Sequence, residues 1–322
     1  MMNRALWTGR QDIDGAGDTR RLHQVVSPFD ETSRGGAALI GFACDEGVRR
    51  NYGRVGAAHG PDAIRRMLAA LPAHGIEHVF DAGNLTCDDE QLEQAQQRLA
   101  GKVQQVLAQH AFPLTLGGGH EVAYGTFLGI IQHLGQALHS GHLLIINFDA
   151  HFDLRESELA SSGTPFKQMA DWCHQAGIEF HYLCYGISRL GNTPALFARA
   201  EDLGVQFKLD SDLVFTDIVD LGRELLDQLA AATYVYLTID LDVLPAEKAP
   251  GVSAPAAYGV PLEKIEYLTQ LAKNSGKLIA ADIAECNPNY DRDNLTAKVA
   301  ARLAHTLLQS RNMSLNISKI SR

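Results

Sequence analysis

Short apolar segments alternate with longer amphipathic segments along most of the chain, and this alternation restricts the possible folds more than any other feature. Within residues 88–110, for example, Leu92, Leu99 and Val103 recur at helical spacing. The segments with strand character are residues 37–44, 78–81, 112–116, 143–148, 180–187, 205–209, 234–239 and 278–283. Apolar strands separated by helices of crossover length are typical of a parallel sheet with both faces covered. The pattern therefore predicts an α/β fold.

No low-complexity linker or break in composition divides the chain, so we expect a single domain. Residues 1–36 are polar and contain several glycines and aspartates, which predicts an irregular N-terminal arm. The α/β domain is expected to span 37–309, and residues 310–322 to form a polar C-terminal tail.

The charge balance limits the possible partners of the chain. It has 28 lysines and arginines against 38 aspartates and glutamates, a net charge of −10, and its basic residues are scattered. Neither a nucleic-acid-binding surface nor a membrane-binding surface is expected from such a distribution. The five cysteines lie far apart and no pair has CxxC spacing, and no signal peptide or membrane span is evident. A cytoplasmic protein is the expectation.

Three polar clusters follow predicted strands. Residues 147–153 read Asn-Phe-Asp-Ala-His-Phe-Asp, so Asp149, His151 and Asp153 alternate with apolar residues after the strand 143–148. The other two clusters contain His120, after three glycines, and Asp240 with Asp242. In a parallel sheet, ligands bind at the carboxyl ends of strands. We therefore expect the three clusters to lie at one edge of the sheet.

The residue types in these clusters indicate a metal site. Four are carboxylates, two are imidazoles and none is a thiolate. This set favours a hard or borderline ion such as manganese over a structural zinc. Six ligands also suggest two ions, which together would hold a bridging water and present it as hydroxide. Each cluster alone could instead be a turn or a helix cap, but coincidence at three strand ends is the weaker explanation.

The motifs at 117–120, 149–153 and 240–242 resemble, in order and approximate spacing, the three metal motifs of the arginase–agmatinase (ureohydrolase) family. The resemblance extends from about residue 39 to the last predicted helix. It implies a three-layer α/β/α domain around a mainly parallel sheet of about eight strands. It also implies two Mn²⁺ ions, hydrolysis of a linear C–N bond at an amidine or guanidine carbon, and assembly into homo-oligomers.

The resemblance also implies a role for each motif residue. His120, Asp149, Asp153 and Asp240 would bind one metal ion. The second ion would be bound by Asp149, His151, Asp240 and Asp242, so that Asp149 and Asp240 bridge the two. Glu285 occupies the place of the family's glutamate that holds the amidine end of the substrate, although a surface carboxylate at a strand end is the alternative interpretation.

The loop after the second motif departs from the pattern of arginases and agmatinases. Those enzymes usually carry a His-Gly pair there, and this chain reads Ser-Ser-Gly-Thr-Pro-Phe at 161–166, with Ser162 in the place of the proton-shuttling histidine. Residues 41–50, 149–155 and 162–166 instead resemble the histidine-degradation branch of the family. The substrate of that branch, N-formimidoyl-L-glutamate, has two carboxylates, and Arg155 could form a bidentate pair with one of them. Arg54 is a second candidate for this contact.

The expected reaction is attack of metal-bridging hydroxide on the formimidoyl carbon, releasing formamide and L-glutamate, with Asp153 accepting a proton from the water. Three alternatives remain open from the sequence. The chain could be another ureohydrolase that releases urea from agmatine, guanidinobutyrate or arginine. It could be a non-catalytic scaffold, or a zinc amidohydrolase related to the deacetylases.

Overall fold

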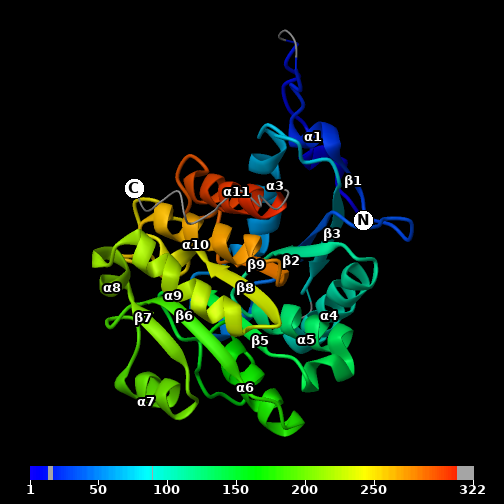
Figure 1. The fold of residues 1–322 in the computed structure, drawn as a ribbon. Helices are drawn as coiled ribbons and strands as arrows, with labels where there is room; N and C mark the ends of the chain where they lie inside the picture. Colours follow the sequence, from blue (N-terminus) through cyan, green and yellow to red (C-terminus); the bar gives the residue numbers. More distant parts are fainter. Residues whose placement is uncertain (14–16, 89, 310–322) are drawn as a thin grey trace.

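The computed structural model describes residues 1–13, 17–88 and 90–309. Within these residues the chain forms one parallel nine-stranded sheet with helices on both faces (Figure 1). The strand order is β1-β3-β2-β4-β9-β8-β5-β6-β7. The strands are β1 (Val26–Pro28), β2 (Ala37–Ala43), β3 (Val79–Thr86), β4 (Phe112–Leu116), β5 (Leu143–Phe148), β6 (His181–Ile187), β7 (Gln206–Leu209), β8 (Tyr234–Asp240) and β9 (Leu278–Ala284).

The expected fold class is confirmed, and the structure adds two details to it. The segment expected to be an irregular arm contains β1, which pairs in parallel with β3 and forms an edge of the sheet. Because β1 has only three residues, of which Ser27 and Pro28 are exposed, no local pattern marks it as a strand. Strand β3 also continues beyond the expected segment 78–81. The polar tail 310–322 lies outside the described residues.

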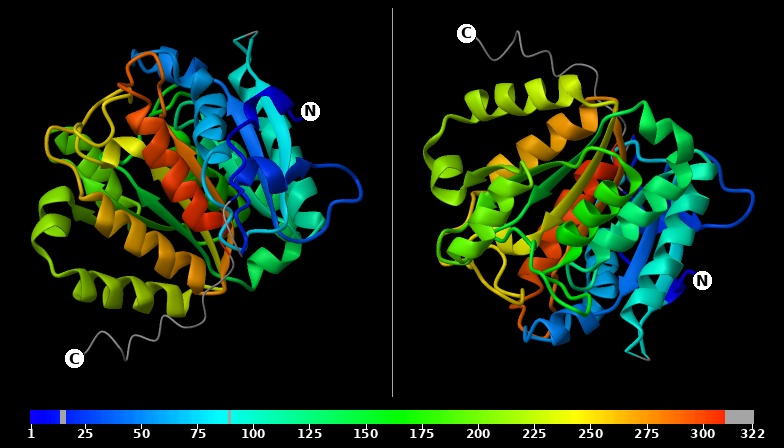
Figure 2. Two further views of the ribbon diagram at one scale, coloured as in Figure 1. Left: turned by 90° about the horizontal axis from the view of Figure 1, so that it is seen from above. Right: turned by 90° about the horizontal axis from the view of Figure 1, so that it is seen from below.

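Helices connect the strands and form the two outer layers (Figures 1 and 2). They are α1 (Leu22–Val25), α2 (Glu46–Arg50), α3 (Gly60–Ala69), α4 (Leu92–Ala108), α5 (Val122–Leu134), α6 (Pro165–Ala176), α7 (Pro194–Asp202), α8 (Asp210–Phe215), α9 (Ile218–Ala231), α10 (Leu262–Asn274) and α11 (Leu295–Leu308). Proline lies in the first turn of α3, α6 and α7, where its missing N–H costs no hydrogen bond. Among the residues that the structure describes, no helix is both long and apolar enough to cross a membrane.

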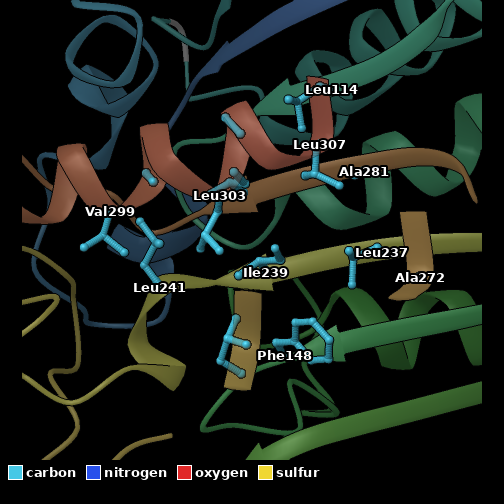
Figure 3. Packing of buried hydrophobic residues seen from close by; sticks show 14 of the residues in the cluster. Leu114, Phe148, Leu237, Ile239, Leu241, Ala272, Ala281, Val299, Leu303 and Leu307 are labelled. Atoms are coloured by element: carbon cyan, nitrogen blue, oxygen red, sulfur yellow. The ribbon is translucent and has the colours of Figure 1, made fainter. Parts of the chain in front are cut away.

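The core consists of two apolar layers, one on each face of the sheet. In β5, Leu144, Ile146 and Phe148 pack against the layer that includes α3, α9, α10 and α11, whereas Leu143 and Ile145 pack against α4, α5 and α6. Figure 3 shows Phe148 next to β8 in the first of these layers, which also contains the labelled residues of β9 and α11. Because successive side chains of a strand point to opposite faces, a strand that is buried on both faces is apolar throughout. This explains the continuous apolar runs of the sequence.

The sheet order positions the polar strand ends. Strands β4, β9, β8 and β5 are consecutive neighbours in the middle of the sheet, and all are parallel. Their carboxyl ends therefore lie side by side, although they are far apart in the sequence.

Candidate metal centre

The loop after β4 is held close to its neighbours by glycine. Gly118 donates to Phe42 O at 2.8 Å, and its own carbonyl accepts the N–H of Glu285 at 2.8 Å. A Cβ on Gly118 would lie 1.6 Å from Cys44 O. Only glycine fits at this position, and the loop consequently delivers His120 to the sheet centre.

The loop after β5 presents three side chains toward the same region. Asp149 Oδ1 accepts the N–H of His151 at 2.6 Å, and Asp149 Oδ2 accepts from Asn147 Nδ2 at 2.9 Å. Asp153 has a φ of 48°, a left-handed conformation that is strained for an aspartate. The chain turns sharply there, and the Asp153 carboxylate faces His120.

The first cluster contains His120, Asp149, Asp153 and Asp240. Nδ1 of His120 lies 3.0 Å from Asp149 Oδ2, 2.9 Å from Asp153 Oδ2 and 3.2 Å from Asp240 Oδ2. On the other side of the ring, Nε2 is 3.0 Å from Thr238 Oγ1, which fixes the ring orientation. Nδ1 is buried and has no hydrogen bond of acceptable geometry with a described residue. One donor atom from each of four residues thus surrounds a common point.

The second cluster contains Asp149, His151 and Asp242. Nδ1 of His151 lies 3.0 Å from Asp242 Oδ2 and 3.5 Å from Asp149 Oδ1. Asp149 belongs to both clusters, with one carboxylate oxygen toward each. Asp240 belongs to the first cluster, and its Oδ1 accepts the N–H of Asp242 at 2.8 Å. The bridging role expected for Asp240 stays a prediction.

The electrostatics of the two clusters show a shortage of positive charge. Burial, together with the charge of Asp149, raises the pKa of Asp153 to about 6, and burial beside Asp240 raises the pKa of Asp242 well above its ordinary value. Burial lowers the pKa of His120, but the neighbouring carboxylates of Asp149 and Asp153 outweigh it and raise that pKa well above its ordinary value. The raised pKa values mean that these side chains hold protons strongly, because, among the described residues, protons are the only positive charge available to the clustered carboxylates. The donor set of carboxylates and imidazoles fits divalent metal ions that would replace those protons.

Glu285 lies beside the first cluster. Its Oε1 accepts the N–H of His120 at 3.1 Å, and its Oε2 is buried without a hydrogen-bond partner among the described residues. Burial, with the neighbouring charge of Asp240, raises the pKa of Glu285 well above its ordinary value. Its φ of 66° is left-handed, so the backbone is strained at this position as it is at Asp153. One buried oxygen of Glu285 is thus left unpaired beside the first cluster.

The structure separates the two candidate arginines. Arg54 donates to Ser253 O at 2.9 Å and to Val252 O at 2.5 Å, and its guanidinium stacks on Tyr290 at 4.3 Å. Arg54 therefore holds two loops together. Arg155 is exposed and forms no ion pair with a described residue, and its side chain runs along Gly163. Of the two arginines, Arg155 is the one whose guanidinium has no hydrogen bond or ion pair with a described residue, and its role in binding a ligand stays a prediction.

Three residues near the metal clusters were not expected from the sequence. Phe166 lies against His120 with ring centroids 5.3 Å apart, so an apolar side chain of the 161–166 loop contacts the cluster. Thr238 orients His120, and the buried Glu121 accepts the N–H of Gly47 at 2.9 Å. Nothing in the sequence marks Phe166 or Thr238 as a site residue, because an apolar ring and a strand hydroxyl are common in any core. Glu121 could have been recognised, because it is a carboxylate directly after His120 in a glycine-rich loop.

The chain is similar to known proteins over most of its length. The family model described as "Arginase family" matches residues 36–309. A formimidoylglutamase of Cupriavidus pinatubonensis is 56% identical over 306 residues, covering 94% of this chain and 97% of that protein. A formimidoylglutamase of Paraburkholderia xenovorans is 53% identical over 317 residues, covering 95% and 98%.

Solved structures are similar as well. The formimidoylglutamase of Bacillus subtilis has a TM-score of 0.77 at 23% identity, covering 93% of this chain and 95% of that one, and it shares the fold. The formiminoglutamase of Trypanosoma cruzi, solved with Mn²⁺, has a TM-score of 0.75 at 26% identity, covering 85% and 92%. An arginase of Bacillus subtilis has a TM-score of 0.73 at 26% identity, covering 85% and 99%.

Proposed function

The chain belongs to the arginase family, and from that premise we propose that it hydrolyses N-formimidoyl-L-glutamate to L-glutamate and formamide. The observation that carries this proposal is the identity of more than half with formimidoylglutamases over nearly the whole length of both chains. The two buried clusters of carboxylates and imidazoles support a metal-dependent hydrolase.

The proposed metal ligands follow the two clusters. His120, Asp149, Asp153 and Asp240 would hold one divalent cation, and Asp149, His151, Asp240 and Asp242 the other. We propose Mn²⁺, because carboxylates outnumber imidazoles and no thiolate is present. When bound, the two ions would lower the pKa of a shared water and make hydroxide available at neutral pH.

The protein side chains supply binding and proton transfer. We assign to Glu285 the amidine end of the substrate, because its unpaired Oε2 can accept an N–H from that group. Asp153 accepts the proton of the attacking water and returns it to the nitrogen of glutamate as the C–N bond breaks. The apolar ring of Phe166 beside His120 excludes bulk water from this part of the site.

Two residues of the neighbouring loop are proposed to bind the glutamate part of the substrate. Arg155 has a free guanidinium that can pair with a carboxylate through two N–H donors. Ser162 lies in the same loop and is buried, so its hydroxyl can make a shielded hydrogen bond. A substrate with two carboxylates can bind to both Arg155 and Ser162, whereas a cationic substrate such as agmatine would be repelled by Arg155.

The second candidate is another ureohydrolase, and the similarity to the Bacillus subtilis arginase favours it over other classes. A single assay distinguishes the two. Mn²⁺-supplemented protein is given N-formimidoyl-L-glutamate, agmatine or L-arginine, and the products are identified. We expect formamide and L-glutamate from the first substrate and no turnover of the others. Release of urea from agmatine or arginine, without formamide from the first substrate, would reject the proposal.

We also propose a cytoplasmic location and a homo-oligomeric assembly. The four buried thiols Cys44, Cys173, Cys184 and Cys286 suit a reducing compartment. Size-exclusion chromatography with light scattering tests the assembly, and a mass of one chain across the working concentration range would reject it.

A further inference from the structure

Backbone hydrogen bonds connect the turn that contains Ser162 to the segment that carries Asp153. The N–H of Arg155 donates to Gly163 O at 2.8 Å, and the N–H of Phe166 donates to Asp153 O at 3.3 Å. The chain from 153 to 166 is therefore closed at its base by backbone hydrogen bonds, one end of which is a proposed metal ligand. A small movement of Ser162 relative to the clusters is resisted by both bonds.

The segment that follows β2 packs closely onto this turn. A Cβ on Gly47 would lie 2.8 Å from Ser162 N, and a Cβ on Gly163 would lie 3.2 Å from Asn51 Nδ2. The backbone of Gly47 is thus in direct contact with the backbone of Ser162, and the Asn51 side chain lies against Gly163. At this contact Asn51 Nδ2 donates to Ser162 Oγ at 3.2 Å.

That hydrogen bond determines where the Ser162 proton can go. A serine hydroxyl has one hydrogen to donate, and its oxygen here already accepts from Asn51. No described residue accepts a hydrogen bond from Ser162, and the residue is only 7% exposed. A buried donor without an acceptor is costly, so the hydroxyl is set to donate to a ligand. The cation of Arg155, which packs along Gly163, makes an anionic ligand the suitable one.

Asn51 is itself held in place. It caps the C-terminus of α2, where its N–H donates to Gly47 O at 3.0 Å. The N–H of Gly47 in turn donates to the carboxylate of Glu121, which is fully buried and directly follows His120. The backbone of Asn51 is thus connected, through the hydrogen bond to Gly47 and the hydrogen bond from Gly47 to Glu121, to the loop that carries His120.

We propose that Asn51 is a positioning residue that orients the Ser162 hydroxyl as a hydrogen-bond donor toward a carboxylate of the substrate. This inference rests on the proposed function and deepens it. Asn51 makes the loop selective for an anionic substrate without being required for the chemical step. Removing it frees the Ser162 hydroxyl to rotate and to bind water instead.

The test is a double-mutant cycle on Mn²⁺-loaded full-length protein with N-formimidoyl-L-glutamate. Asn51→Ala and Ser162→Ala are each expected to raise KM about three- to tenfold, the range of one neutral hydrogen bond, with kcat changed less than about twofold. The double variant is expected to match Ser162→Ala, because Asn51 acts through Ser162. The inhibition constant of L-glutamate, a dicarboxylate product, should rise by a similar factor in the same variants.

Two further variants control for folding. Asn51→Asp keeps the shape of the side chain but offers an acceptor and a negative charge, so it should raise KM more than Asn51→Ala does. Asn274→Ala, at the last residue of α10 and just before the amino end of β9, should leave KM and kcat unchanged.

Three results overturn the inference. They are additive effects in the double variant, a fall in kcat at constant KM, or an unchanged KM in both Asn51 variants. Failure of the wild-type protein to hydrolyse N-formimidoyl-L-glutamate at all is a different outcome. It rejects the proposed function, and this inference with it.

Discussion

Asp149 is the residue on which the two clusters depend, because one of its carboxylate oxygens faces His120 and the other faces His151. Burial alone would raise the pKa of Asp149, but the neighbouring imidazoles of His120 and His151 reverse this and hold the pKa below its ordinary value. Asp149 is therefore ionised at every pH at which the protein is expected to work. The neighbouring Asp153, whose pKa is raised to about 6, is the carboxylate that gives up its proton with more difficulty.

Replacement of Asp149 by alanine is predicted to remove bound metal and activity together. Each cluster loses a donor, so metal content should fall from two ions to one or none, and kcat/KM by about a hundredfold or more. Metal analysis and steady-state assays measure both. Asp171→Ala, which removes an exposed aspartate paired with Lys167 on α6, is the matched control. Full activity in Asp149→Ala would contradict the two-metal interpretation.

Replacement of Arg155 by alanine is predicted to act on substrate binding. Loss of a charge-assisted pair corresponds to about a ten- to hundredfold rise in KM for N-formimidoyl-L-glutamate, with kcat nearly constant. Arg155→Lys keeps the charge but not the two parallel donors, so its KM should be intermediate. Arg223→Ala, an exposed arginine on α9, serves as control. An unchanged KM in Arg155→Ala would remove this residue from the substrate site.

At the scale of elements, α3 is joined to β3 by a buried ion pair. Arg65 and Asp81 are each 1% exposed, and Arg65 Nη2 donates to Asp81 Oδ1 at 2.9 Å. The second oxygen of Asp81 accepts from Trp7 Nε1 at 2.7 Å, which ties the N-terminal segment to the same point. Since β3 carries β1 on its outer side, this network holds the edge of the sheet in place.

Replacement of Asp81 by alanine is predicted to destabilise the fold without emptying the metal site. Arg65 would remain buried without its partner, which costs about 3–5 kcal/mol. Trp7→Phe removes one hydrogen bond and keeps most of the packing, so its cost should be about 1 kcal/mol. Urea unfolding at a fixed metal concentration compares the variants. A stability of Asp81→Ala equal to that of the wild type would show that the pair contributes nothing net.

At the scale of the whole molecule, the metal site joins distant parts of the chain. The hydrogen bond from His120 N to Glu285 connects residues 165 positions apart, and the clusters take side chains from the ends of β5 and β8 and the loop after β4. In the absence of cations, the clustered carboxylates repel one another across the middle of the sheet. We therefore expect bound metal to stabilise the entire domain rather than one loop.

Metal binding is predicted to raise the melting temperature by an amount that depends on pH. A ligand at a hundred times its dissociation constant stabilises a fold by about 2.7 kcal/mol. The raised pKa of Asp153, about 6 against an ordinary 3.8, stabilises the metal-free fold below pH 3.8, and this contribution is lost as the pH rises through about 6. Protons also compete with metal for this carboxylate. The difference in melting temperature between Mn²⁺-loaded and chelated protein should therefore narrow as the pH falls from 7.5 through about 6.

Scanning calorimetry across this pH range measures the difference, and titration calorimetry in two buffers of different ionisation enthalpy detects the protons that metal binding releases. A difference in melting temperature that is independent of pH, with no proton release, would contradict the prediction.

The sequence by itself determined the elements of this protein and the chemistry at their ends. Segments such as β5 and β8 are buried and mostly apolar because both faces of the sheet are covered, so their local pattern already indicates buried parallel strands. Asp149, His151 and Asp153 follow such a strand directly. Their residue types and spacing are local properties, and they could be recognised without knowing what lies beside them.

Only the tertiary structure decided which of these side chains meet and which neighbours orient them. Strand β1 exists because β3 offers an open edge, and Arg54 holds loop carbonyls instead of facing a ligand. The contact of Asn51 with Ser162 joins residues 111 positions apart. Such contacts depend on how separate loops pack, and the free energy that selects them is distributed over the whole core. No local pattern of residues carries that information.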